Sequence, residues 1–169
     1  IGRFDPLKDF NNFVQASELV LRDLDSVKFL MVGRGLDKDN AELNIWIKKT
    51  LHPDNFILIG EASSHDLLAA MDVYCLSSKA EGFPNVVAEA MAMRIPCVVT
   101  DVGDAARIVG ESGVVVEPMD AYALYKGLML MLTLEKHDRQ ALGDTARQSI
   151  ENQYDIREVQ KKFLDLVTA

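Results

Sequence analysis

Short β-branched apolar runs alternate along the chain with longer stretches of helical periodicity, which is the pattern of a parallel sheet whose strands are joined by crossover helices. Strands are predicted over residues 27–32, 56–59, 73–76, 97–100 and 114–116. Helices are predicted over residues 10–22, 41–51, 65–71 and 84–93. We therefore expect an α/β fold, with a Rossmann-like parallel sheet and helices on both of its faces.

The last third of the chain carries apolar side chains at helical spacing and little strand signal, so we expect helices packed on the sheet there. The apolar positions are Leu124, Leu128, Met131 and Leu132, followed by Val159, Phe163, Leu166 and Val167. No Pro-, Gly- or Ser-rich linker interrupts the sequence, and a chain of this length buries roughly 70% of its unfolded surface. Residues 1–169 are expected to form a single domain.

The charge balance excludes some classes of partner. A formal net charge of −8 argues against a broad surface for nucleic acid or anionic membranes, because binding to phosphate backbones requires clustered Lys and Arg. Cys75 and Cys97 lie in apolar runs and match no Cys–His metal spacing. We expect two buried thiols in a reducing compartment, no metal site and no cofactor.

The segment from Ser77 to Met91 contains two carboxylates on either side of a Gly-Phe-Pro turn. The turn follows the predicted strand at 73–76, and Pro84 suits a first helical position, where its missing N–H costs nothing. The free amides of the first helical turn favour an anion, while Glu81 and Glu89 can accept hydrogen bonds from neutral hydroxyls. This segment predicts a site for a sugar joined to a diphosphate.

Glycines follow two of the other predicted strands. Gly33-Arg34-Gly35 lacks the third glycine of G-x-G-x-x-G, because Lys38 occupies that position. These glycines either form a tight turn or present their amides to a nucleotide. Since the carboxyl ends of parallel strands share one edge of a sheet, the loops at 33–35, 60–61, 77–84 and 100–104 are expected to lie together.

Two cations near the start of the chain are candidates for phosphate binding. A strand end followed by a short loop would aim Arg3 and Lys8 at the helix start near Pro84. The alternative is that both are ordinary surface cations.

An ordered series of short motifs runs through nearly the whole chain. The series comprises Gly2-Arg3 with Lys8, Val32-Gly33-x-Gly35, Ile59-Gly60, Asp72-Val73 leading to Ser78, Glu81-Gly82-Phe83-Pro84 with Glu89-Ala90-Met91-Ala92, Pro96, and Thr100-Asp101-Val102-Gly103. In this order the motifs resemble the carboxyl-terminal domain of group 1 glycosyltransferases. The resemblance implies one half of a two-domain GT-B architecture, the half that binds the nucleotide-sugar donor. It also implies that an acceptor domain precedes Ile1 and that the first strand is truncated.

Carried over to this sequence, the resemblance implies a role for each matching residue. Arg3 and Lys8 would bind the donor diphosphate, and Glu81 would contact hydroxyls of the transferred sugar. Glu89 would contact the ribose hydroxyls. The remaining donor-binding positions would be Gly33, Gly35, Gly60, Gly82, Phe83, Pro84, Asn85 and Val86.

The resemblance further implies a retaining hexosyltransferase that acts by front-face displacement, in which the departing diphosphate takes the acceptor proton and Glu81 is not a nucleophile. The partners would be a nucleoside-diphosphate sugar and a glycan, lipid or small-molecule acceptor. The isolated domain would be inactive without its other half. A cytoplasmic location is expected, with membrane association possible only through that other half.

Three positions depart from the family pattern. Asp9 and Asp104 stand where glycine is usual, and each places a negative charge near the expected anion site. Asp9 would either lower diphosphate affinity or point to solvent, and Asp104 could bind a sugar hydroxyl. Arg94 replaces a helix-ending glycine and need only tolerate that turn.

Two other functions remain open at this stage. A sugar-nucleotide epimerase shares the two-domain architecture, and a non-catalytic nucleotide-binding module could keep the fold without turnover. Formation of a new glycosidic bond would separate the transferase from both. The sequence leaves the nucleotide base, the sugar, the acceptor and the oligomeric state undetermined.

Overall fold

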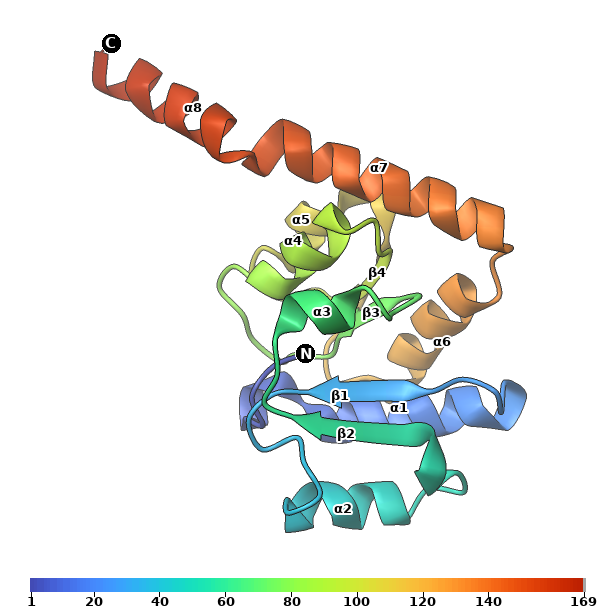
Figure 1. Ribbon diagram of the computed structural model, residues 1–169. Coiled ribbons are helices and arrows are strands. Elements are labelled where there is room, and N and C mark those ends of the chain that lie inside the picture. The colour runs from blue at the N-terminus through green and yellow to red at the C-terminus, as the bar shows by residue number, and fades with distance from the viewer. Residues whose placement is uncertain (169) are drawn as a thin grey trace.

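A computed structural model describes residues 1–168, except for the side chains at positions 64, 158, 159, 161, 162 and 168 (Figure 1). The strands are β1 (Phe29–Val32), β2 (Phe56–Gly60), β3 (Tyr74–Leu76), β4 (Cys97–Thr100) and β5 (Val114–Val116). The helices are α1 (Phe10–Asp23), α2 (Ala41–Lys48), α3 (Ser64–Leu68), α4 (Asn85–Ala92), α5 (Ala105–Val109), α6 (Ala121–Leu132), α7 (Lys136–Tyr154) and α8 (Ile156–Thr168), and three short 3-10 helices are η1 (Pro6–Lys8), η2 (Pro53–Asn55) and η3 (Gly110–Ser112). Every predicted strand and crossover helix is present, with ends shifted by at most three residues.

All strand pairs within the described residues are parallel, as expected, but they form two sheets rather than one. β1 pairs with β2, and β4 lies between β3 and β5. A cavity of about 640 Å³ is lined by residues of both sheets, among them Met31 of β1 and Cys75 of β3, and by Leu128 of α6. In the part of the chain that the structure describes, β1 and β3 are therefore not hydrogen-bonded to each other.

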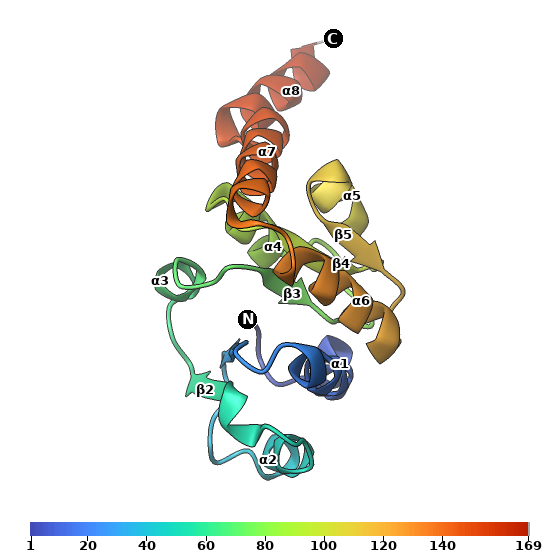
Figure 2. The same ribbon diagram turned by 90° about the vertical axis from the view of Figure 1, so that its right-hand side faces the viewer.

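Helices cover both faces, which confirms the predicted fold class (Figure 2). The reason is visible along β4, where successive side chains point to opposite sides. Cys97 and Val99 join one apolar cluster with residues of α4 and α7, whereas Val98 joins a second cluster with residues of α1 and α6. All three side chains are buried, and full burial of a valine contributes roughly 1.5–3 kcal/mol.

The C-terminal helices differ in what they contact. α6 packs on α1, β4 and β5, as predicted, while α7 packs mainly on α4. α8 packs on α7 and extends past the body of the molecule (Figure 1), so the prediction that it covers the sheet was wrong. Phe163 is 67% and Leu166 is 81% exposed, and the side chain of Val159 lies outside the described residues. Helical spacing predicts an apolar face but does not identify what covers it.

Within residues 1–168, none of the helices combines the length and the apolar character needed to cross a bilayer.

Candidate functional site

The loop after β1 is held between the start of the chain and the end of β2. The Gly2 N–H donates to the Val32 carbonyl at 2.8 Å, and the Gly33 N–H donates to the Gly60 carbonyl at 2.8 Å. Gly33 has a φ of +138°, and a Cβ there would lie 2.0 Å from the Gly2 carbonyl oxygen. Gly33 therefore forms a tight turn, and its own amide is engaged within the fold.

Gly35 lies in the same turn and faces the N-terminal segment. A Cβ on Gly35 would lie 2.9 Å from the Cβ of Phe4, and the Phe4 N–H donates to the Arg34 carbonyl at 2.8 Å. These contacts place the segment that carries Arg3 and Lys8 against the end of β1.

A short 3-10 turn presents Lys8. Pro6 begins η1, and the Asp5 carboxylate accepts a hydrogen bond from the Leu7 N–H at 2.9 Å, which caps the turn. Lys8 is the last residue of η1, and its Nζ donates to Glu81 Oε1 at 2.5 Å. The two side chains are 28% and 13% exposed, so this ion pair is partly shielded from water.

Glu81 is oriented by a second donor. The Ser78 hydroxyl donates to Glu81 Oε1 at 2.6 Å, and the Ser78 carbonyl accepts a hydrogen bond at 2.7 Å from the fully buried hydroxyl of Thr100. Because both donors converge on Oε1, the other carboxylate oxygen is the one placed to accept a hydrogen bond from a ligand. Neither Ser78 nor Thr100 was predicted to have a role, although Ser78 stands only three positions before Glu81.

The main chain at Glu81 is fixed by the loop after β4. Gly103 has a φ of +53°, and a Cβ there would lie 2.3 Å from the Glu81 carbonyl oxygen and 2.4 Å from that of Gly82. The Asp104 N–H donates to the Gly82 carbonyl at 2.9 Å. The carboxyl ends of β3 and β4 therefore meet here, as predicted for this edge of the sheet.

The first turn of α4 opens beside this loop. Pro84 is the N-cap residue and makes no side-chain capping bond, so α4 starts one residue later than predicted, at Asn85. With no side chain capping the helix, the first-turn amides of Asn85 and Val86 can bind an anion. Phe83 is 39% exposed and its ring contacts that of Tyr154 edge-on at 5.6 Å, a contact with α7 that the sequence did not indicate.

Arg3 and Glu89 lie outside the direct contact between Lys8 and Glu81. The Arg3 guanidinium is 63% exposed and pairs with Asp5 at 3.1 Å. Glu89 is exposed on α4. Burial raises the pKa of the Tyr74 hydroxyl well above its ordinary value, and Cys97, Cys75, Glu81 and Glu89 raise it further in that order.

The acidic departures from the family pattern are paired with cations. Asp104 accepts two hydrogen bonds from Arg107, at 3.2 and 2.9 Å, so its carboxylate is occupied by the neighbouring helical residue. Asp9 is 7% exposed and lies 3.3 Å from the Lys79 ammonium. Of the two alternatives for Asp9, the one in which its side chain points to solvent is therefore wrong.

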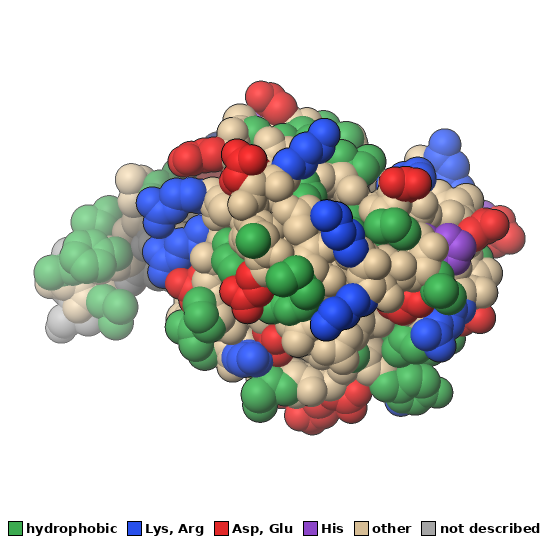
Figure 3. Space-filling model, turned by 90° about the horizontal axis from the view of Figure 1, so that it is seen from below, with side chains coloured by type: hydrophobic (Ala, Val, Ile, Leu, Met, Phe, Trp, Pro, Cys, Tyr) green, Lys and Arg blue, Asp and Glu red, His purple; other side chains and the backbone are tan. Residues whose placement is uncertain are grey.

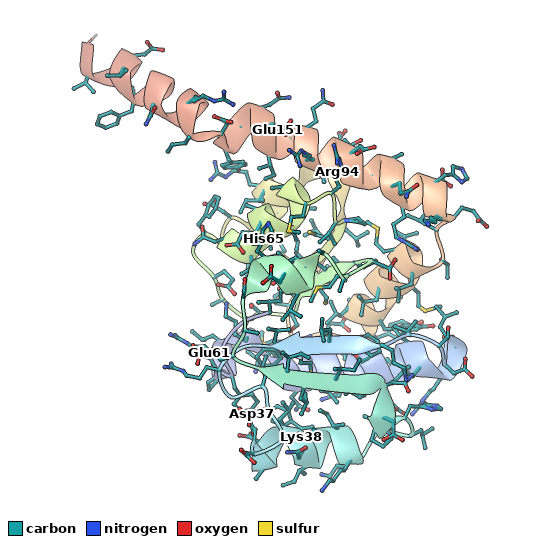
Figure 4. All side chains as sticks on the ribbon, in the orientation of Figure 1. Asp37, Lys38, Glu61, His65, Arg94 and Glu151 are labelled. Carbon is teal, nitrogen blue, oxygen red and sulfur yellow. The ribbon has the colours of Figure 1, made fainter. Side chains whose placement is uncertain are left out.

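Arg94 does adopt the helix-ending conformation that glycine usually supplies. Its φ is +62°, two residues after the end of α4, and its guanidinium pairs with Asp144 at 2.8 Å, so that it lies beside α7 (Figure 4). This pair is at the end of α4 remote from Lys8 and Glu81.

The molecule carries neither a basic stripe on the face seen in Figure 3 nor, among its described residues, a cluster that could hold a metal ion. On the face seen in Figure 3, Lys and Arg side chains are interspersed with Asp and Glu rather than gathered in a basic stripe. Among the described residues, no group of three or more His, Cys, Asp and Glu side chains is arranged to hold a metal ion. The cavity between the sheets is lined by neither Lys8 nor Glu81.

Comparison with known proteins connects this geometry to a family. The chain is 28% identical over 167 residues to the N-acetyl-alpha-D-glucosaminyl L-malate synthase of Bacillus anthracis, which covers 96% of this chain and 42% of the synthase. The curated relatives that it matches are longer, and the chain spans between 34% and 42% of their lengths.

Two solved structures show the same fold. A variant of S. aureus TarM in complex with Fondaparinux, alpha-GlcNAc-glycerol and UDP superposes with a TM-score of 0.85 at 23% identity, over 99% of this chain and 35% of that one. Anabaena HepE in complex with UDP superposes with a TM-score of 0.85 at 20% identity, over 99% of this chain and 48% of that one. The family profile described as Glycosyl transferases group 1 matches residues 1–133. The chain therefore belongs to the group 1 glycosyltransferase family.

Proposed function

We propose that this chain is the donor-binding domain of a retaining hexosyltransferase that uses a nucleoside-diphosphate sugar. The observation that carries the proposal is the Lys8–Glu81 pair beside the uncapped start of α4. A cation, a carboxylate and free helix amides in one place match the phosphates and hydroxyls of such a donor. The complexes of TarM and HepE with UDP support the choice of ligand.

In the proposed reaction, the acceptor oxygen bonds to the anomeric carbon on the face that the diphosphate leaves. The bond between that carbon and the phosphate oxygen breaks, and the acceptor proton passes to the departing phosphate oxygen. The protein supplies no nucleophile, so its main task is to stabilise the negative charge that grows on the diphosphate.

Lys8 and the first-turn amides of α4 would carry that task, with Arg3 as a further cation. A hydrogen bond to a charged group contributes roughly 1.5–3 kcal/mol, so loss of Lys8 should slow transfer by about ten- to a hundredfold. Glu81 would accept a hydrogen bond from a hydroxyl of the sugar through Oε2, since Lys8 and Ser78 both donate to Oε1. Glu89, farther along α4, would accept hydrogen bonds from the ribose hydroxyls.

The acceptor would bind to parts of the protein beyond this chain, since the chain spans about two fifths of its curated relatives. We also propose that the protein acts in the cytoplasm. Cys75 and Cys97 are both free thiols, which fits a reducing compartment.

Glycosyl transfer by the full-length protein tests the proposal. Nucleoside-diphosphate sugars with uridine, guanosine and adenosine bases are supplied in turn, and the anomeric configuration of the product is determined by NMR. Lys8→Met and Glu81→Gln should each lower kcat/KM by at least about tenfold, while Asp144→Asn, remote from the site, should not. An epimerised sugar nucleotide without a new glycosidic bond would favour the epimerase. An unchanged rate in Glu81→Gln would contradict the role given to that carboxylate.

A further inference from the structure

Asp9 has a backbone conformation that only a few residue types adopt readily. Its φ and ψ are +48° and +49°, in the left-handed region, at the junction between η1 and α1. Glycine reaches this region without steric cost, and Asp does so where its short side chain can bond locally. Asp9, which directly follows Lys8, therefore depends on local bonds of its side chain to keep this conformation.

Two interactions hold the Asp9 carboxylate in a nearly buried place. Its Oδ1 accepts a hydrogen bond from the Asn12 N–H at 3.4 Å, which caps α1. The same oxygen lies 3.3 Å from the ammonium of Lys79, which belongs to the loop that also carries Glu81. The Asp9 side chain is 7% exposed and that of Lys79 is 41% exposed.

The backbone joins the same two loops on either side of this ion pair. The Lys79 N–H donates to the Leu7 carbonyl at 2.7 Å, and the Ser77 hydroxyl donates to the Lys8 carbonyl at 2.9 Å. The side chains then cross in both directions, because Lys8 reaches Glu81 and Lys79 reaches Asp9. Two hydrogen bonds and two ion pairs thus connect the segment that carries Lys8 to the loop that carries Glu81.

We propose that Asp9 and Lys79 are positioning residues. They hold the loop of Lys8 against the loop of Glu81, so that the Lys8 ammonium stays where the donor diphosphate departs. Neither needs to touch the donor. The Lys79 ammonium also neutralises the Asp9 carboxylate, which would otherwise oppose a diphosphate bound at Lys8. This inference rests on the proposed function of the site.

The test uses the full-length protein with four variants at this pair. Lys79→Met removes the cation, Lys79→Arg keeps it, Asp9→Asn keeps the left-handed backbone and the cap but removes the charge, and a double variant combines Lys79→Met with Asp9→Asn. We expect kcat to fall by roughly three- to tenfold in Lys79→Met and in Asp9→Asn, and no further in the double variant. Lys79→Arg should keep the kcat of the wild type.

The effect should fall on kcat more than on KM, because the charge that Lys8 meets is greatest in the transition state. Asp144→Asn is the matched control, since it also breaks an ion pair to a residue of positive φ, Arg94, but at a place remote from the site. It should leave kcat unchanged.

Three results would overturn the inference: a wild-type kcat in Lys79→Met, additive losses in the double variant, or an equal loss of kcat in Asp144→Asn. A wild-type protein that neither transfers sugar nor binds a nucleoside diphosphate overturns the proposed function, and the inference with it. With an active wild type, the variants at Asp9 and Lys79 bear on the inference alone.

Discussion

Replacing Gly103 with alanine should displace the main chain of Glu81 and thereby impair the site without touching any side chain in it. A Cβ at Gly103 would lie 2.3 Å from the Glu81 carbonyl oxygen and 2.4 Å from the Gly82 carbonyl oxygen. An ordinary contact of a Cβ atom begins at 3.4 Å, so the loop must move by about 1 Å. Both obstacles are backbone atoms that are fixed by β3 and β4, and no flexible side chain can absorb the movement.

Two costs follow from this geometry. The left-handed φ of +53° costs an alanine about 1–2 kcal/mol, which lowers the free energy of unfolding. A displacement of about 1 Å at a group that positions the reacting atoms costs roughly a hundredfold in rate. Gly103→Ala should therefore lower kcat/KM for glycosyl transfer much more than its effect on stability alone would suggest.

Gly110→Ala is the control for the backbone term. Gly110 has the same φ of +53°, with a ψ of −132° that only glycine adopts readily, so an alanine there carries a backbone cost of its own, but its Cβ would meet nothing within 4 Å. The assay compares kcat/KM and the thermal midpoint of both variants in the full-length protein, at a temperature well below either midpoint. Gly110→Ala should lose stability and keep its activity. If both variants lost stability equally and both kept wild-type kcat/KM, the argument that Gly103 permits the close approach to Glu81 would be refuted.

Three further predictions follow from single contacts. Ser78→Ala removes the 2.6 Å hydrogen bond to Glu81 Oε1 and should lower kcat/KM by roughly tenfold with little change in the thermal midpoint; an unchanged rate would mean that Lys8 alone orients the carboxylate. Arg94→Gly removes the strain of a φ of +62°, a gain of about 1 kcal/mol, and loses an exposed ion pair worth less than about 1 kcal/mol. The thermal midpoint should therefore stay the same or rise. A clear fall would show that the ion pair with Asp144 contributes more than the backbone strain costs. Burial raises the pKa of the Cys97 thiol above the ordinary value of 9.0, so this thiol loses its proton at a lower pH in the unfolded chain than in the folded one. The free energy of unfolding therefore falls as the pH rises above 9.0. The loss is about 1.36 kcal/mol per pH unit, which amounts to about 2 kcal/mol at pH 10.5. Urea unfolding at pH 8 and 10.5 should show a smaller alkaline loss in Cys97→Ala than in the wild type, and equal losses would contradict the assignment.

The predicted elements were close to those observed because their causes are local. β4 coincides with the predicted strand at 97–100, since a short run rich in β-branched residues favours a strand that is buried on both faces. The start of α4 was wrong by one residue because Pro84 satisfies both an N-cap and a first helical position. Lys8 and Glu81 were each identified as candidate site residues, but from separate motifs.

The interpretations that were wrong or incomplete concern partners rather than elements. Among the described side chains of α8, Phe163 and Leu166 are exposed rather than packed on the sheet. Helical periodicity predicts an apolar face but carries no information on what that face will contact. Asp9 was expected either to face solvent or to lower diphosphate affinity. Its ion pair with Lys79 could not be predicted, because Lys79 lies far from it in the sequence. The division into two sheets likewise depends on which strand edges are hydrogen-bonded, and strand patterns do not report edges.

The sequence by itself determined the alternation of strands and helices, the edge at which the loops gather, and the motifs that mark the family. These follow from periodicity and turn chemistry within windows of a few residues. Only the tertiary structure decided that Lys8 meets Glu81 across 73 positions, that Ser78 and Thr100 fix this carboxylate, and that Asp9 is paired with Lys79. The physical reason is that contacts between loops depend on how the crossover helices close the strands together, and no local pattern encodes that closure.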